Sequence, residues 1–561
     1  MKNKILLALS VLNMGLLFGQ ATSTEKPKLV VGIVVDQMRF DQLYKYQDRF
    51  SETGFKRLIN DGFSYKNANY SYIPTVTAAG HATIYTGTTP STHGIIGNSW
   101  YKRSIRDDVG NVEDANYPLI GNKEVSKEGR SPNNLQTPTL GDQLRMSTNF
   151  RSKVLSVSFK DRGAILPGGF TANAAYWHDW ESSPGYFVSS SYYMDKMPKW
   201  VDKFNKEGRS DRALNTSWET LYPIESYKNS APDNNKYEQV LRGKETPTFP
   251  YDFKKLRKEY KESGREYLMM WVSPAGNTLL TEFAMEAIDN EALGVDEDTD
   301  LLNISYSVPD VLGHTFGPQS VEIEDVYLRL DLEISNLLNH LDQKVGKNQY
   351  TVFLTADHAA IQVASYLQDN KLPTGIARKS KISNSLADYL FSKTKQDSLV
   401  LHFDGEQVYL DHKRIQQGGL DLQEIQEISR IFLLTKDAIS VAITAKDFQT
   451  NEYRQGIRHL LQNGYQKERS GDISVAFKPG YIQSSNDTLK VSDVKGTTHG
   501  SGWAYDTHVP LVWYGNGIPK GSSVRRVAIK DISPTLAMLL NLQLPSGNSG
   551  IVCREIFESK G

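Results

Sequence analysis

Two runs of apolar residues, each ending at an acidic residue, constrain the fold of this 561-residue chain more than any other feature. The first covers residues 30–35 and ends at Asp36, and the second covers residues 350–356 and ends at Asp357 and His358. Continuous apolar, β-branched runs are typical of strands buried on both faces of a parallel sheet. Ligands of open α/β sheets bind outside the carboxyl ends of such strands. We therefore expect distant segments to bring carboxylates and an imidazole together at one sheet edge.

The length of the chain exceeds the usual size of one domain, which predicts two domains or one core with large insertions. Hydrophobic residues make up 39% and charged residues 23%, an ordinary balance for a folded protein. Lys and Arg number 64 and Asp and Glu 65, so the net charge is −1. This charge does not indicate a nucleic acid or an anionic membrane as a partner.

The N-terminus has the pattern of a secretory signal peptide. Two lysines precede an apolar stretch at residues 5–18, which is too short to span a bilayer, and small residues follow it. The alternative is an N-terminal buried helix. We expect residues 1–20 to be removed, leaving a periplasmic or secreted protein with no membrane anchor. A single cysteine, Cys553, permits no internal disulfide.

Strand-like runs alternate with helical patterns along the chain, which favours βαβ units and a mostly parallel central sheet flanked by helices. Strands are expected at residues 30–35, 154–157, 301–306, 351–355 and 510–514, and helices at residues 77–86, 277–288, 322–341 and 531–540. Three segments interrupt this alternation of strands and helices, near residues 104–135, 180–265 and 360–490. We interpret them as cap insertions over the carboxyl edge of one α/β domain that covers residues 21–561.

More residues of the types that bind metal ions follow the expected strands. Asp310 and His314 are four residues apart, a spacing that places both on one face of a helical turn. His499 lies between glycines, in a loop that permits close approach to a ligand. Carboxylates and imidazoles without cysteine suit divalent metals, zinc above all. We expect two three-ligand sites: Asp36, Asp357 and His358, and Asp310, His314 and His499.

Each of these motifs has a plainer alternative when taken alone. An acid and a histidine four residues apart are more often a surface pair than metal ligands. Asp357 can equally be a helix-capping acid beside a solvated histidine. Only the joint placement after buried strands favours metal binding.

Thr77 is the first residue of the helix expected at residues 77–86. A hydroxyl at a helix N-terminus lies in positive potential, which favours an alkoxide and an anionic phosphate alike. Taken alone, Thr77 is more readily interpreted as an N-cap. His81, on the same helix, is expected to pack and not to bind metal.

Seven segments, in order from about residue 28 to near the C-terminus, resemble the alkaline phosphatase superfamily. They are VDQMR (35–39), PTVTAAGH (74–81), HGIIGN (93–98), KDR (160–162), DVLGH (310–314), ADH (356–358) and GTTHG (496–500). Within that superfamily they are similar to the exported phosphate-irrepressible alkaline phosphatases (PafA type) of the Bacteroidetes. The resemblance implies an exported, monomeric phosphoric monoester hydrolase with two Zn²⁺ ions, acting on small-molecule phosphate monoesters.

The resemblance also implies roles for the metal-binding residues. Thr77 is the nucleophile, it forms a phosphothreonine, and its hydroxyl contacts a zinc ion. One zinc ion lowers the pKa of that hydroxyl and the other lies beside the leaving-group oxygen and later activates water. The first ion is held by Asp36, Asp357 and His358, and the second by Asp310, His314 and His499.

Asn98, Lys160 and Arg162 are implied to bind the phosphoryl group. A monoester dianion has three non-bridging oxygens that share about two charges, so cationic donors stabilise it more than a diester monoanion. The alternative enzyme is a nucleotide pyrophosphatase or phosphodiesterase of the same superfamily, which shares the threonine and the metal ligands. An exported binding protein that holds metal without turnover is a third possibility. Pro309 departs from the expected pattern and predicts a slight shift of the ligand at Asp310.

Overall fold

The computed structural model describes residues 26–121, 128–180 and 185–557. The expected signal peptide at residues 1–20 lies outside this part of the chain. Within the described ranges, no helix is both long enough and apolar enough to cross a membrane.

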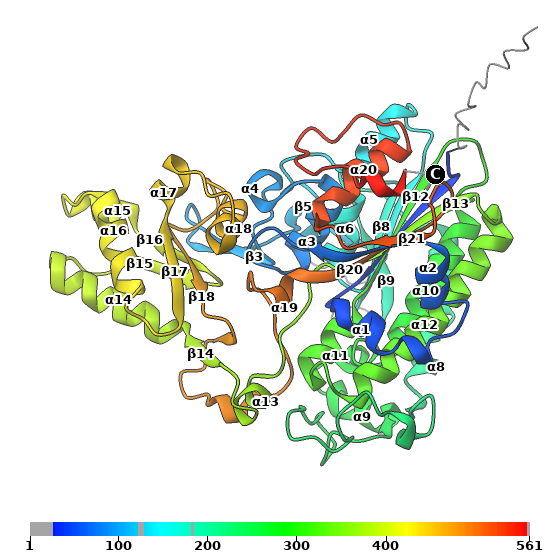
Figure 1. The fold of residues 1–561 in the computed structure, drawn as a ribbon, viewed down its shortest axis with the longest axis horizontal. Coiled ribbons are helices and arrows are strands. Elements are labelled where there is room, and N and C mark those ends of the chain that lie inside the picture. Colours follow the sequence, from blue (N-terminus) through cyan, green and yellow to red (C-terminus); the bar gives the residue numbers. More distant parts are fainter. Residues whose placement is uncertain (1–25, 122–127, 181–184, 558–561) are drawn as a thin grey trace, which may run out of the picture.

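The largest sheet of the described residues has 12 strands and runs through the middle of the molecule (Figure 1). Its centre is a block of five parallel, buried strands. In spatial order these are β13 (Tyr350–Thr355), β1 (Leu29–Val35), β12 (Asp300–Tyr306), β7 (Val154–Ser158) and β8 (Ala174–Asp179). This arrangement confirms the α/β fold with a largely parallel central sheet.

Parallel pairing aligns the carboxyl ends of the central strands. Val35 at the end of β1 pairs with Tyr306 at the end of β12, and Val34 pairs with Thr355 at the end of β13. The residues that follow these strands therefore meet at one edge of the sheet, as the sequence predicts.

The last predicted strand is present, but it runs against the parallel block. This strand, β20 (His508–Gly515), pairs antiparallel with β13 on one side and with β2 (Phe63–Asn69) on the other. Only the short helix α19 (Ala504–Thr507) separates β20 from the loop around His499 at the carboxyl edge. A parallel strand would need a long crossover connection, so a chain that enters the sheet directly from this edge must run antiparallel.

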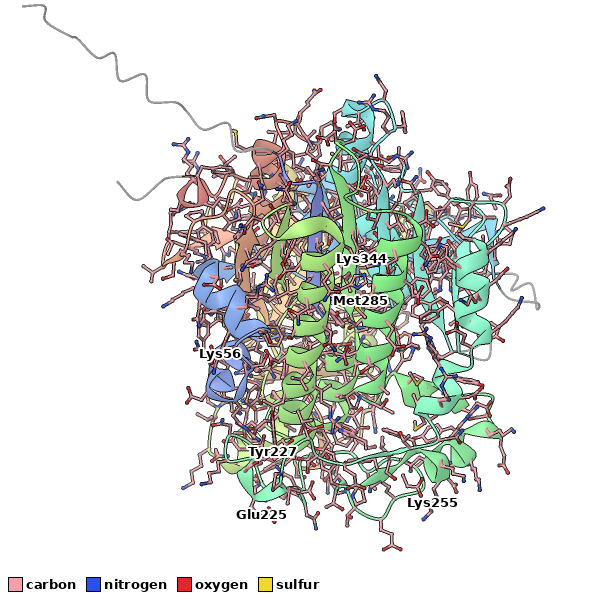
Figure 2. The ribbon with its side chains drawn as sticks, turned by 90° about the vertical axis from the view of Figure 1, so that its right-hand side faces the viewer. Lys56, Glu225, Tyr227, Lys255, Met285 and Lys344 are labelled. Carbon is pink, nitrogen blue, oxygen red and sulfur yellow. The ribbon has the colours of Figure 1, made fainter. Side chains whose placement is uncertain are left out.

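Helices cover both faces of the sheet. The helix α10 (Ala275–Asn290) packs on β7 and β12 and against α12 (Val321–Leu341), and Figure 2 shows these two helices side by side. On the other face, α6 (Asp161–Gly168) packs on β7 and β8 and against α3 (Thr77–Thr86). The four helices predicted from the sequence are all present, and the fourth is α20 (Ile532–Leu539).

Residues within the predicted insertion at 360–490 form a second sheet with its own apolar core. We call this antiparallel sheet the cap sheet. Its strands are β15 (Val400–Asp404), β16 (Gln407–Leu410), β18 (Ile473–Phe477) and β17 (Ile439–Thr444), and α14 (Lys379–Thr394) and α16 (Leu422–Leu433) pack beside it. It lies to the left of the central sheet in Figure 1.

The other two predicted insertions contain short elements. Residues 104–135 include β4 (Asp107–Gly110), β5 (Glu113–Ile120) and β6 (Gly129–Arg130). Residues 180–265 include β9 (Tyr186–Ser190), α7 (Lys199–Lys206), α8 (Arg209–Ala213), β10 (Ser217–Trp218), β11 (Tyr251–Asp252) and α9 (Phe253–Lys261). The grouping of all three segments as insertions in one domain stays a prediction.

Candidate active site

The ends of β1 and β13 bring three predicted metal ligands together. Asp36, Asp357 and His358 are fully buried, and each offers a ligand atom within 4.8 Å of those of the other two. The Nε2 atom of His358 lies 3.5 Å from Asp36 Oδ1 and 3.6 Å from Asp357 Oδ2. The backbone N–H of Asp36 donates to Tyr306 O at 3.0 Å, which fixes the strand end that carries it.

The chemistry of this group fits a divalent cation. Oδ1 of Asp36, Oδ2 of Asp357 and Nε2 of His358 are buried and have no hydrogen-bond partner, whereas Oδ2 of Asp36 lies 2.6 Å from the Lys160 ammonium group. A buried carboxylate oxygen without a hydrogen-bond partner lowers the stability of the folded state unless a nearby cation compensates its charge. Burial, followed by repulsion from the neighbouring carboxylates, raises the pKa of Asp36 to about 7. Burial also lowers the pKa of His358, which favours the neutral imidazole that binds metal.

The second predicted group lies on α11 (Val308–Phe316) and on the loop before α19. Asp310 and His314 are one helical turn apart, and Nε2 of His314 lies 3.2 Å from Asp310 Oδ1. Nε2 of His499 lies 3.7 Å from the same oxygen. Pro309 occupies the first turn of α11, where the missing N–H of proline breaks no helical hydrogen bond.

The two groups form one continuous cluster. The rings of His358 and His499 stack with their centroids 3.5 Å apart. Both histidines form a compact ligand group with Asp310, and this group does not include His314, which the sequence analysis assigned to the second site. The Nδ1 atoms of His314 and His499 lie 2.8 Å from the backbone oxygens of Thr497 and Thr75, respectively. Such contacts orient the rings and leave Nε2 available for a metal.

Lys160 connects this cluster to Thr77. Its Nζ lies 2.6 Å from an oxygen of Asp36, 2.6 Å from one of Asp310, and 3.4 Å from Thr77 Oγ1. Burial opposes the charged ammonium, but Asp310 and Asp36 outweigh burial and raise the pKa of Lys160. Thr77 is the first residue of α3 and the N-cap is Val76, so the N-cap interpretation of Thr77 is wrong.

Asn98 and Arg162 come from neighbouring elements. The Oδ1 atom of Asn98 accepts a hydrogen bond from Ala78 N at 3.0 Å, which ties the amide to the start of α3. Arg162 is the second residue of α6, its side chain is 25% exposed, and its Nε is buried without a hydrogen-bond partner. Both residues therefore retain N–H donors for a ligand.

His81, the histidine that the sequence analysis expected to pack, has structural contacts on both ring nitrogens. His81 is buried, with Nδ1 2.8 Å from Thr77 O and Nε2 2.8 Å from Ser305 Oγ. It belongs to neither compact ligand group, but the same is true of His314, so the packing role of His81 stays a prediction.

Gln37 is a site residue that the sequence analysis missed. Its backbone N–H donates to Asp357 Oδ1 at 3.2 Å, and its Nε2 donates to Asp310 Oδ1 at 2.5 Å, so it links both ligand groups. Its φ of 65° is unusual for a residue with a side chain, and such strain concentrates at functional sites. The only sequence signal was its position directly after Asp36.

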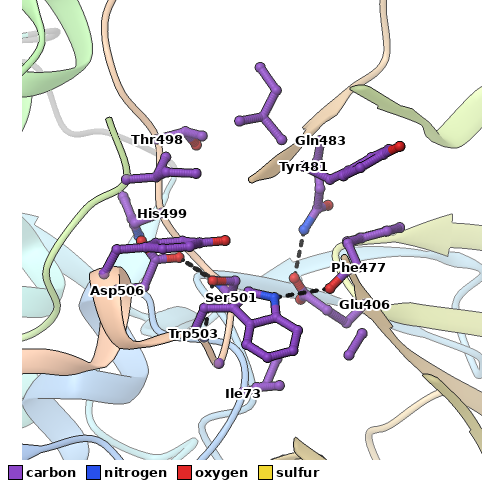
Figure 3. Close-up of a pocket in the computed structure, with 15 residues that line it drawn as sticks. Ile73, Glu406, Phe477, Tyr481, Gln483, Thr498, His499, Ser501, Trp503 and Asp506 are labelled. Atoms are coloured by element: carbon purple, nitrogen blue, oxygen red, sulfur yellow. Dashed lines mark hydrogen bonds between the residues drawn. The ribbon is translucent and has the colours of Figure 1, made fainter. Parts of the chain in front are cut away.

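The cap sheet contributes a second missed residue, Glu406. This glutamate is 4% exposed, and its Oε1 accepts from Gln483 Nε2 at 2.6 Å. Figure 3 shows both side chains across a small cavity from His499 and Asp506. Glu406 also lines a neighbouring cavity of about 260 Å³, together with Asn98 and His499. The cap sheet therefore borders the candidate site, and burial raises the pKa of Glu406 to about 8.

Comparison with known proteins gives full-length matches. Residues 30–502 match the family model described as type I phosphodiesterase / nucleotide pyrophosphatase. The chain is 42% identical to a protein of Myroides odoratus named calcium-transporting ATPase, over 95% of each chain. It is 39% identical to alkaline phosphatase PafA of Elizabethkingia meningoseptica, over 97% of each chain. The crystal structure of wild-type alkaline phosphatase PafA matches with a TM-score of 0.88 and 39% identity, over 95% of this chain and 99% of that one.

Proposed function

The chain belongs to the type I phosphodiesterase / nucleotide pyrophosphatase family within the alkaline phosphatase superfamily, close to the PafA-type alkaline phosphatases, and we propose that it hydrolyses phosphate monoesters through a phosphothreonine at Thr77. As an alkaline phosphatase it is a phosphomonoesterase; the intermediate, the metal identity and the residue roles are our proposal. The observation that carries the proposal is the Lys160 ammonium group, which lies 3.4 Å from Thr77 Oγ1 and between Asp36 and Asp310.

Thr77 is suited to act as the nucleophile. Its hydroxyl lies at the N-terminus of the buried helix α3, where the helix dipole stabilises negative charge on an alkoxide or a phosphate. Attack by Thr77 Oγ1 on phosphorus would form the phosphothreonine and break the bond to the leaving-group oxygen, which would take up a proton and leave as the alcohol. Water would then cleave the P–O bond, which would release inorganic phosphate and regenerate the Thr77 hydroxyl. Lys160, within reach of that oxygen, would hold the phosphoryl group in line.

Two zinc ions are the proposed cofactors. Asp36, Asp357 and His358 would hold one ion, with Thr77 Oγ1 beside it, and Asp310, His314 and His499 would hold the other. When bound, such a pair supplies Lewis-acid stabilisation to the attacking and leaving oxygens of a phosphoryl transfer. The unpartnered ligand atoms of Asp36, Asp357 and His358 support this assignment.

The substrates we propose are small-molecule phosphate monoesters. Lys160, Arg162 and Asn98 would donate to the three non-bridging oxygens of the dianion. We also propose that the protein is exported, on the signal-like pattern of residues 1–20, and acts in the periplasm or outside the cell. The expectation of a monomer stays a prediction.

The second candidate is a nucleotide pyrophosphatase or phosphodiesterase, the activity that the family model's description names. A phosphodiesterase would share the proposed threonine and metal ligands. The residues that distinguish the two activities are therefore the phosphoryl-binding cations, Lys160 and Arg162. The full-length identity to alkaline phosphatase PafA and the match to its crystal structure favour the monoesterase.

The double variant Lys160→Ala with Arg162→Ala tests this assignment. Each charge-assisted hydrogen bond contributes about 1.5–3 kcal/mol, roughly ten- to a hundredfold in rate if it forms mainly in the transition state. We expect kcat/KM to fall steeply on an aryl phosphate monoester and much less on the matching diester. The two losses need not add, because both cations can contact the same oxygens.

The matched control removes the same charges elsewhere, through Arg151→Ala with Lys344→Ala. Both side chains form exposed ion pairs, with Asp298 and Asp289 respectively. The control should leave both rates unchanged. Equal losses on monoester and diester in the Lys160 and Arg162 double variant would contradict a role in monoester selectivity and favour the diesterase.

A further inference from the structure

The cavity of about 260 Å³ that Glu406 lines reaches two residues with proposed roles in catalysis, Asn98 and His499. Under the proposed function, on which this inference rests, Asn98 binds the phosphoryl group and His499 holds the zinc ion beside the leaving-group oxygen. The alcohol part of a bound ester would therefore extend from His499 into this space. Residues of the cap sheet, Glu406 and Tyr409 among them, contribute to the lining.

The cap sheet comes close to the loop that carries His499. A Cβ atom built on Gly500, the residue after His499, would lie 3.9 Å from Glu406 Oε1. Apart from the chain neighbours of Gly500, no other heavy atom of the described residues would lie within 4 Å of it. Open space therefore separates this loop from the Glu406 carboxyl group, and a leaving group beside His499 would be within reach of Glu406.

Glu406 and Gln483 form a polar pair on the cap side of the cavity (Figure 3). Gln483 lies on β19 (Tyr481–Ser484), and its Nε2 donates to Glu406 Oε1 at 2.6 Å. In the part of the chain that the structure describes, this is the one side-chain hydrogen bond of Gln483, so its Oε1 accepts none. A carboxyl group beside a primary amide offers both acceptors and N–H donors, which match alcohol hydroxyls because these donate and accept.

Three aromatic residues supply apolar wall area. Trp100 and Tyr101 lie on β3 (Ser99–Lys102), Tyr409 lies on β16, and all three line the cavity. The rings of Tyr101 and Tyr409 have centroids 5.4 Å apart, and Tyr101 also stacks on His402 at 5.0 Å. These contacts hold the rings in place before a ligand binds, which lowers the entropic cost of binding. The negative faces of aromatic rings attract the weakly positive C–H hydrogens of a saturated ring.

The size and charge of the cavity limit what it can hold. Pockets for drug-sized ligands usually measure about 300–1,000 Å³, so about 260 Å³ suits a single ring better than a nucleoside. Among the described residues that line the cavity, Lys379 is the only Lys or Arg, and its Nζ already pairs with Asp404 Oδ1. The lining therefore offers no free cation to an anionic leaving group such as a second phosphate.

We propose that this cavity is a leaving-group subsite that selects phosphate monoesters of one polyhydroxylated ring, that is, sugar monophosphates. Glu406 and Gln483 hydrogen-bond the ring hydroxyls, and the aromatic wall contacts the C–H bonds of the ring. A site built to hydrogen-bond hydroxyls rejects an analogue that lacks them, because its polar groups are then left unpaired. The subsite sets substrate preference and takes no part in the attack by Thr77.

A matched pair of substrates tests the proposal on the zinc-loaded full-length protein. Glucose 6-phosphate and cyclohexylmethyl phosphate are both primary esters on a six-membered ring, but the second has no ring hydroxyls. We expect kcat/KM for glucose 6-phosphate to be higher by about tenfold or more, the value of one hydrogen bond to a charged group. An aryl phosphate, measured alongside, reports phosphatase activity independently of the subsite.

Glu406→Leu removes the hydrogen-bonding group at similar size. It should abolish the preference for glucose 6-phosphate and leave kcat/KM for cyclohexylmethyl phosphate and the aryl phosphate near wild type. Glu406→Gln, which can still bond hydroxyls, should keep part of the preference. The matched control, Glu424→Leu, changes an exposed glutamate on α16 and should keep all of it. Gln483→Leu, at a partly exposed position, should lower the preference by several-fold.

Binding gives a readout that does not depend on turnover. By calorimetry, the zinc-loaded Thr77→Ala protein should bind glucose 6-phosphate about tenfold or more tightly than cyclohexylmethyl phosphate. Adding Glu406→Leu to this variant should bring the two Kd values together.

Two results would overturn the proposal. One is a wild-type protein that hydrolyses the aryl phosphate but has equal kcat/KM for the two ring substrates, which would leave the proposed function standing and exclude the subsite. The other is a preference that persists in both Glu406→Leu and Gln483→Leu. If Glu406→Leu does not fold, Gln483→Leu decides. A zinc-loaded protein that hydrolyses none of the three esters would instead exclude the proposed function, and the subsite with it.

Discussion

Replacing Thr77 with alanine is expected to lower turnover of phosphate monoesters by about four to six orders of magnitude, the usual cost of removing a covalent nucleophile. The fold should persist, because the side chain is small and its hydroxyl makes only a long contact, at 3.4 Å, with the Lys160 ammonium group among the described residues. Steady-state kinetics on an aryl phosphate, with zinc content and Tm measured on the same sample, checks both statements.

Thr86→Ala is the matched control for this change. Thr86 is another buried threonine on α3, and its hydroxyl donates to Ala82 O at 2.7 Å. The control should retain turnover near that of the wild type. A Thr77→Ala protein that is folded, zinc-loaded and within about tenfold of wild-type activity would exclude Thr77 as the nucleophile.

Removal of zinc is expected to abolish activity and to lower Tm. Asp36, Asp310 and Asp357 are buried close together, and burial with mutual repulsion raises the pKa of Asp36 to about 7 and of Asp357 to about 6. Without metal, the single Lys160 ammonium group compensates these three carboxylates only in part, so they destabilise the folded state. Chelation followed by titration with zinc, monitored by metal analysis, activity and Tm, should show recovery that is complete at two zinc ions per chain.

The variant Asp36→Asn tests the same prediction at a single proposed metal ligand. It removes one charge from the ligand group that contains Asp357 and His358, and should reduce bound zinc and activity together. Calcium should not restore activity to the chelated protein. Full activity in metal-free protein would refute the two-metal account.

The sequence predicted the central sheet because buried parallel strands have a continuous apolar signal. The runs before Asp36 and Asp357 are β1 and β13, and their register places both acids at the same edge. Helix α3 has the predicted bounds because Pro74 and Thr75 precede it and Gly87, with a φ of 69°, ends it.

Other features of the fold and of the candidate site had no signal in the local sequence. The direction of β20 follows from where the chain re-enters the sheet after the cap sheet, which no periodicity encodes. Gln37 contacts Asp310, which is 273 residues away along the chain, and Glu406 contacts Gln483, which is 77 residues away. Both become site residues only through such long-range contacts. Long-range packing of this kind lies beyond pattern reasoning.

The most direct test of the central claim is to identify where phosphate is bound during turnover. The zinc-loaded enzyme is mixed with an excess of an aryl phosphate monoester, quenched in acid and analysed by peptide mass spectrometry. The account predicts one phosphate on the peptide that contains Thr77, located at Thr77 and missing from the Thr77→Ala protein. Phosphate on any other residue of the wild-type enzyme, or phosphorylation that persists in Thr77→Ala, would contradict it.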